Sequence, residues 1–231
     1  MRGADRGIRP LRPPAQRWAV FDAAQGGGYI PALASFQGRR SMGLTIRPSN
    51  PALMAVGRIL VANRELLVAR WAGWISDRLT QAPHIKRPTV ERQLTLLIDI
   101  LIEMAGPLRR QTAQLWFDAC EFYGQVAAAR GLAAGEVVEE IQHLRELLIR
   151  DLSELIAALP ARHSMATVLR LNRQVDKGIA HAVVGYTDAL VQNLFAQRGT
   201  PIPDPLPAND DIVYRLNQFE AELQHLREKS R

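Results

Sequence analysis

The sequence predicts an all-α protein, a bundle of about five helices followed by a separate C-terminal helix with a heptad pattern. Three observations support this prediction. From Ser49 onward, apolar residues recur every three or four positions, which is the period of one helix face. Proline and glycine interrupt the pattern in several places, as they do between helices. No segment after residue 50 shows the sustained alternation of apolar and polar residues that marks a half-buried strand.

Charge and cysteine content limit the classes of protein to consider. The 231 residues carry a net charge of +6, and all of it lies in residues 1–50, which contain eight Arg and two Asp. The remainder has 21 basic and 21 acidic side chains, so we expect no basic nucleic-acid-binding face there. The lone Cys120 excludes an intramolecular disulfide and fits a cytoplasmic protein. No apolar run reaches the ~20 residues of a membrane span, so no membrane association is expected.

Residues 1–49 are rich in Arg, Gly and Pro and have no helical period, which predicts a flexible arm. Three interpretations of this arm remain open. It is a basic segment that contacts anionic partners such as nucleic acid, an organellar transit segment, or a stretch that precedes a true translation start at Met42. It lacks the continuous apolar region of a secretory signal.

The bundle is predicted to span residues 50–197, and its first helix begins at Asn50-Pro51, where Asn is a preferred N-cap and Pro a preferred first residue. The inward stripe of this helix is Val56, Leu60, Asn63, Leu67, Trp71 and Trp74. A second helix, from about Thr89 to Ala105, is apolar over most of its circumference, which predicts a central position. Asp99 and Glu103 lie on its remaining strip, as a solvated edge or as a carboxylate pair for acid–base chemistry or metal binding.

Three further helices complete the predicted bundle. Gly106-Pro107 starts the third, which ends at Gly131. The fourth runs from Gly135 to the residue before Pro160. The fifth extends from about Ser164 to Gln197 and is long enough for a kink at one of its glycines, Gly178 or Gly185.

A Pro-rich spacer, residues 198–208, and a short coiled-coil-like helix, residues 209–231, follow the bundle. Asn209 is expected to cap this helix. Its apolar residues have heptad spacing, which predicts an element for dimerisation or signal transmission. They are Ile212, Leu216, Phe219, Leu223 and Leu226.

The order of the helices resembles the N-terminal sensor domain of bacterial stressosome RsbR-type proteins (RsbRD type). The segments that carry the resemblance are ILVANRELLVARWAGWI (59–75), LLIDILIEM (96–104), VAAARG (126–131), EVVEEIQHLRELLIRDL (136–152) and VDKGIAHAVVGYTDAL (175–190). The resemblance covers about residues 52–195. The resemblance implies a globin-like helical bundle, usually without haem, that forms dimers and passes a signal to an attached output module.

One departure from this family is clear, because no STAS or kinase module follows residue 195. The resemblance therefore implies a stand-alone signal-transduction sensor or adaptor that forms a homodimer and couples to a separate STAS-domain or switch-kinase partner.

Small residues recur on one face of the fifth predicted helix and allow another helix to approach closely. They are Gly178, Ala182, Gly185 and Ala189. Two interpretations remain open, packing within the bundle and a dimer contact across a two-fold axis.

A ligand site is predicted only in outline. Arg145 falls near the apolar seam of the fourth helix, and we expect it to line such a site with Trp71, Trp74 and Tyr186. The two Trp side chains also fit plain packing.

No catalytic residue, metal site or cofactor is predicted, and we expect a protein that is not an enzyme. Motifs such as GxSxG, GxGxxG and the P-loop are missing from the sequence. His143 has the spacing of a metal ligand to Glu139 and Glu140, but we interpret all three as a polar helix face. His181 is expected opposite the apolar stripe of its helix. Haem binding by a globin-type sensor is the alternative function, and a Soret band would reveal it.

Overall fold

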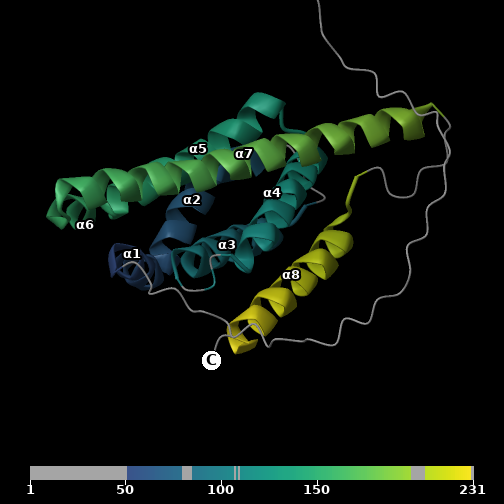
Figure 1. Cartoon of the computed structure of the whole chain (residues 1–231). Coiled ribbons are helices and arrows are strands. Elements are labelled where there is room, and N and C mark those ends of the chain that lie inside the picture. The colour runs from purple at the N-terminus through teal and green to yellow at the C-terminus, as the bar shows by residue number, and fades with distance from the viewer. Residues whose placement is uncertain (1–50, 80–84, 107, 109, 199–205, 230–231) are drawn as a thin grey trace, which may run out of the picture. The chain divides into compact units, whose positions relative to one another are not determined.

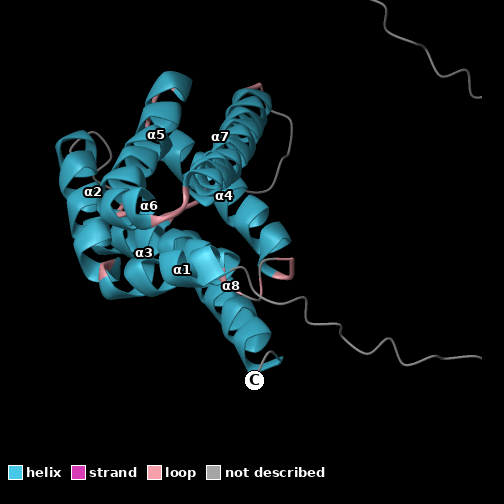
Figure 2. Cartoon of the chain, turned by 60° about the vertical axis from the view of Figure 1, so that its left-hand side comes forward, coloured by secondary structure: helices cyan, strands magenta, loops and turns pink. Residues whose placement is uncertain are grey.

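The computed structural model describes residues 51–79, 85–106, 108, 110–198 and 206–229 (Figure 1). All of them belong to the larger of two compact units of the chain, residues 45–231. In these residues the chain contains eight helices and no strand, so the all-α prediction is confirmed (Figure 2). The predicted arm and most of the predicted spacer lie outside the described residues.

The helices are close to the predicted segments, with three differences in their bounds. The elements are α1 (Pro51–Ala62), α2 (Arg64–Leu79), α3 (Arg87–Ala105), α4 (Thr112–Ala129), α5 (Ala134–Asp151), α6 (Ser153–Ala158), α7 (Ala161–Gln197) and α8 (Asn209–Lys229). The first predicted helix is divided at Asn63, whose side-chain amide donates to the Ile59 carbonyl at 3.1 Å, beside the backbone amide of the same residue at 3.0 Å. The fourth is divided at Leu152, which is fully buried. The third begins at Thr112 rather than at Pro107.

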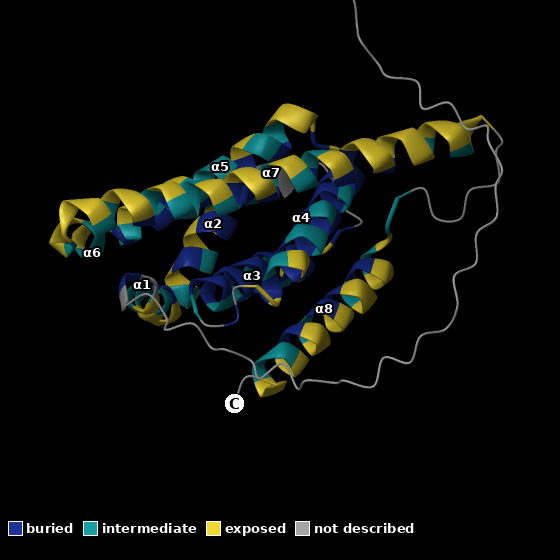
Figure 3. Cartoon of the chain, in the orientation of Figure 1, coloured by how far each residue is buried: buried dark blue, intermediate teal, exposed yellow. Residues whose placement is uncertain are grey.

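Helices α3 and α4 form the centre of the bundle, and their inner surfaces are buried along most of their length (Figure 3). Helices α1 and α2 pack on α3, while α7 crosses α4 and α5 (Figure 1). Helix α8 packs on α3 and α4. The central position predicted for the second helix is therefore confirmed, because α3 contacts α1, α2, α4 and α8.

Glycine permits an unusually close crossing of α4 and α7. A Cβ atom on Gly124 would overlap the backbone carbonyl of Ala182, and one on Gly185 would overlap the carbonyl of Glu121. One glycine from each helix therefore brings the two backbones into direct contact, and any side chain at either position would force them apart.

Helix α4 ends in a left-handed glycine. Gly131 has φ +79°, a conformation that L side chains adopt rarely. The amide of Leu132 donates to the Ala127 carbonyl at 3.1 Å and that of Gly131 to the Ala128 carbonyl at 3.0 Å, which is the Schellman pattern of helix termination. This turn places Arg130 at the end of α4 with its side chain directed into the bundle, where it is 1% exposed.

None of the described helices is long and apolar enough to cross a lipid bilayer.

Candidate functional site

The four residues predicted to line a ligand site have partners within the protein. The indole of Trp71 is fully buried and donates to the Glu140 backbone carbonyl at 2.8 Å. Trp74 stacks on His143 with ring centroids 4.5 Å apart. The guanidinium of Arg145 pairs with Asp176 of α7 at 3.0 Å. The hydroxyl of Tyr186 donates to a backbone carbonyl, that of Leu132, at 2.8 Å. Each of the four joins two parts of the chain.

The two histidines of interest lie against aromatic rings. His143 is half-buried beneath Trp74, and burial lowers its pKa, although Glu146 acts in the opposite direction. The ring of His181 stacks on Phe117 of α4 at 4.5 Å, with the planes 10° apart. The sequence placed both rings on outer helix faces, but each contributes to the packing of two helices.

Glu140 is the largest correction to the sequence analysis, which placed it on a polar face with His143. The structure buries this carboxylate completely, between α4 and α5. Arg130 forms two hydrogen bonds to it, at 2.6 and 3.0 Å, and the Tyr123 hydroxyl donates a third at 2.5 Å. Trp71 stacks on Tyr123 and binds the backbone of Glu140, so that α2 joins the same group.

We call Trp71, Tyr123, Arg130 and Glu140 the buried cluster. A fully buried ion pair is stable only when its hydrogen bonds are well formed, because both ions lose their hydration. Here the carboxylate accepts three hydrogen bonds from two side chains of α4 and its C-terminal turn. The cluster therefore fixes how α2, α4 and α5 lie relative to one another.

The charges of the buried cluster follow from its surroundings. Burial raises the pKa of Tyr123, and the adjacent Glu140 carboxylate raises it further, so the phenol remains protonated and acts as a donor. Burial alone would lower the pKa of Arg130, but Tyr123 and Glu140 outweigh it, and the pKa is raised. Arg130 is therefore cationic.

A signal for this cluster is present in the sequence. Glu140 follows Val137 by three residues and precedes Leu144 by four, so it lies on the apolar stripe of its helix. A carboxylate on such a stripe requires a buried cation, and Arg130 stands ten positions earlier, before the helix-ending Gly131.

The small-residue stripe of α7 packs within the chain. Gly178 faces Trp116, and Ala182 and Gly185 contact the backbone of α4. All four residues of the stripe, including Ala189, are buried. This is the packing interpretation of the two that the sequence left open, and a second copy could reach these residues only if α4 moved away.

The apolar seam of α8 is covered by the same chain. Ile212, Leu216, Phe219 and Leu223 are buried, and Leu226 is partly buried against the core. The ring of Phe219 lies 5.7 Å from that of Phe122 in α4. The heptad pattern thus serves an intramolecular helix contact in this structure.

Asp99 and Glu103 do not act together, because each pairs with a different arginine. Asp99 binds Arg64 of α2 through two hydrogen bonds, at 2.5 and 2.8 Å. Glu103 accepts a hydrogen bond from Arg227 of α8 at 2.7 Å. The solvated-edge interpretation therefore describes them better than a catalytic pair.

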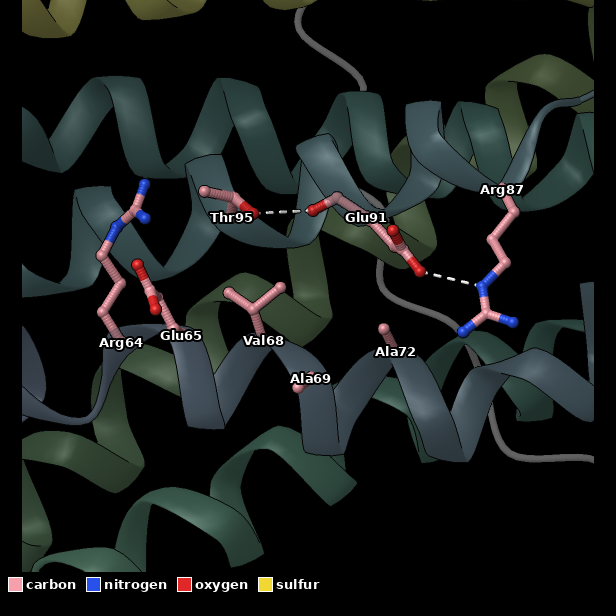
Figure 4. Close-up of a pocket in the computed structure, with 8 residues that line it drawn as sticks. All are labelled: Arg64, Glu65, Val68, Ala69, Ala72, Arg87, Glu91 and Thr95. Carbon is pink, nitrogen blue, oxygen red and sulfur yellow. Dashed lines mark hydrogen bonds and ion pairs between the residues drawn. The ribbon is translucent and has the colours of Figure 1, made fainter.

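An open groove of about 300 Å³ lies between α2 and α3 (Figure 4). Its floor is apolar, formed by Val68, Ala69 and Ala72. Its rim is charged, and at one end Arg87 pairs with Glu91 at 2.8 Å. None of the four predicted ligand residues lines this groove. Arg87 and Thr95 both bind Glu91, as the dashed lines of Figure 4 show, and Arg64 binds Asp99 outside the groove.

A patch of exposed apolar side chains covers the C-terminal part of α7, which extends past the other helices in Figure 1 and is largely exposed in Figure 3. Helical geometry places the patch opposite the small-residue stripe, so it faces away from α4. Its members, which we call the α7 patch, are Val184, Leu190, Val191, Leu194 and Phe195, between 37% and 55% exposed.

Comparison of the chain with protein-family models, with curated proteins and with solved structures finds no match.

Proposed function

We propose that this chain is a non-catalytic sensor or adaptor of signal transduction, of the stressosome RsbR type, that acts as a cytoplasmic homodimer through helix-mediated contacts. The observation that carries the proposal is the α7 patch. Contiguous apolar side chains on an otherwise polar surface mark interaction sites, because their exposure to water is unfavourable.

The partner proposed for the α7 patch is a second copy of the same chain. Val184 and Val191 are seven residues apart, as are Thr187 and Leu194, which is the spacing of a two-helix seam. Toward the N-terminus of α7 the same face carries Arg173, which separates the α7 patch from two further exposed apolar residues, Leu169 and Met165. A heptad seam on one helix can pack against its own copy across a two-fold axis.

The order of the sequence motifs supports the rest of the assignment. The five segments that resemble RsbR-type sensor domains coincide with α1–α2, α3, the end of α4, α5 and the middle of α7. In that family the fold is a globin-like bundle, and we propose the same arrangement here. A STAS-domain or switch-kinase protein is the proposed recipient of the signal.

The buried cluster suits the role of a sensor bundle. A signal acts by stabilising one arrangement of helices over another. Packing by apolar side chains tolerates small shifts, whereas a buried ion pair with three hydrogen bonds holds α4 and α5 in one relative position. A change in the relative position of α4 and α5 would therefore require breaking the ion pair and its hydrogen bonds.

Substitution in the α7 patch tests this proposal. Leu194→Asp places a charge at the most exposed residue of the α7 patch, where it would be desolvated in a dimer, so the mass in sedimentation velocity is expected to fall to that of a monomer. Met165→Asp is the matched control, because Met165 is 61% exposed at the opposite end of the same helix. A mass that is equal for the wild type and Leu194→Asp would refute the α7 homodimer.

A further inference from the structure

Helix α8 is attached to the bundle along a single face. Its buried apolar residues, Ile212, Leu216, Phe219 and Leu223, recur at steps of four, three and four. They lie on α3 and α4, and the Phe219 ring contacts that of Phe122. An amphipathic helix laid on an apolar surface between two helices is a common mode of peptide recognition.

Polar contacts at the edges of this surface fix the register of α8. Arg92 of α3 binds the Glu220 carboxylate through two hydrogen bonds, at 2.5 and 2.7 Å, and reaches Asn217 at 2.6 Å. Near the other end, Arg227 donates to Glu103 at 2.7 Å. These contacts make α8 and α3 run in the same direction.

A third polar contact comes from Asn209, at the start of α8. The sequence predicted that Asn209 caps its own helix, but its side-chain oxygen accepts hydrogen bonds from the Lys86 amide at 3.2 Å and from the Thr89 hydroxyl at 2.9 Å. It therefore completes the first turn of α3. The amide before α8, that of Ala208, is bound instead by Asp211 at 3.0 Å.

The contact of α8 differs from the internal contacts of the bundle. The α4–α7 crossing brings backbones together through glycines and cannot open without exposing them. The α8 contact is made by side chains alone, and its edge pair Arg92–Glu220 is 35% and 42% exposed. Water can replace such an edge contact at small cost.

We propose that the α3/α4 surface is a helix-binding site, and that α8 of a second copy of this chain fills it by reciprocal exchange. The charge pattern selects α8 as the occupant, because the site presents Arg92 and Glu103 at positions that match Glu220 and Arg227, and a second copy held in the homodimer offers the same helix. This inference deepens the proposed function, since it rests on the homodimer and names the segment that the two copies share.

Charge reversal in two separate chains tests the exchange. Arg92→Glu alone and Glu220→Arg alone each bring like charges together, so hydrogen exchange of the amides in residues 209–229 is expected to become about fivefold faster in each variant. In an equimolar mixture, the altered site of the first variant receives the altered α8 of the second, and the native site of the second receives the native α8 of the first. Both exchanged pairs then join opposite charges. Wild-type protection is expected to return, and to increase with protein concentration.

Two controls make the outcome decisive. The double variant Arg92→Glu/Glu220→Arg restores the pair within one chain, so its protection is expected at every concentration and shows that the substitutions permit folding. Glu222→Arg makes the same charge change at an exposed position of α8 and is expected to leave exchange unchanged. A mixture whose exchange is the average of its two components would overturn the proposal, as would single variants with wild-type exchange. A mixture that only averages, together with a monomeric Leu194→Asp, would overturn the exchange and leave the α7 homodimer standing, whereas an unchanged mass of Leu194→Asp would overturn the α7 homodimer.

Discussion

Arg130–Glu140 and Arg92–Glu220 are two ion pairs with two hydrogen bonds each, in different surroundings. Each guanidinium binds its carboxylate through two nitrogens, at 2.6 and 3.0 Å in the first pair and at 2.5 and 2.7 Å in the second. Both side chains of the first pair are 0% exposed, whereas those of the second are 35% and 42% exposed. The comparison shows that hydration, more than geometry, determines what the loss of one partner costs.

The largest effect is expected from Glu140→Ala. It leaves the Arg130 cation and the Tyr123 hydroxyl buried without their acceptor, which destabilises a protein by about 3–5 kcal/mol. Urea unfolding followed by circular dichroism measures this loss. A change below about 1 kcal/mol would mean that water reaches the cluster and would remove the distinction between the two pairs.

A smaller effect is expected when the polar groups of the cluster are replaced together. Arg130→Met/Tyr123→Phe/Glu140→Leu removes the charges and hydroxyl while retaining apolar volume, and such replacements are often neutral or stabilising. The triple variant should therefore unfold at a higher urea concentration than Glu140→Ala. If it were equally unstable, shape rather than charge would account for the role of the cluster.

The smallest effect is expected at the α8 edge. Arg92→Ala should cost about 0.2–1 kcal/mol, as for other exposed pairs, because the Glu220 carboxylate regains water. A double-mutant cycle with Glu220→Ala gives the pair energy, which should decrease as salt is added. A pair energy above about 3 kcal/mol that is insensitive to salt would mean that Arg92–Glu220 behaves as a buried ion pair, like Arg130–Glu140.

Much of the fold could be predicted from the sequence because its breakers are local. The spacing of apolar residues and the positions of Pro and Gly predict the helices from α3 onward to within a few residues. The division at Asn63 was missed because the apolar period continues through it, as do the backbone hydrogen bonds from Asn63 to Ile59 and from Leu67 to Asn63. The division at Leu152 was missed for a similar reason, because a buried leucine continues the stripe on both sides.

The candidate site was predicted less well, because its members meet only in three dimensions. Arg130 and Glu140 belong to different helical segments, and neither residue type suggests burial by itself. Of the four proposed ligand residues, Trp71 and Tyr186 are buried, but each donates its hydrogen bond to a backbone carbonyl of the protein. Periodicity predicts which face a side chain occupies and carries no information about what it meets there.

The position of Asn209 has a consequence for biosynthesis. The oxygen that completes the start of α3 belongs to a residue 120 positions after Thr89. During translation, α3 emerges from the ribosome long before that residue is made. Its first turn therefore lacks this acceptor until residue 209 has also left the ribosome.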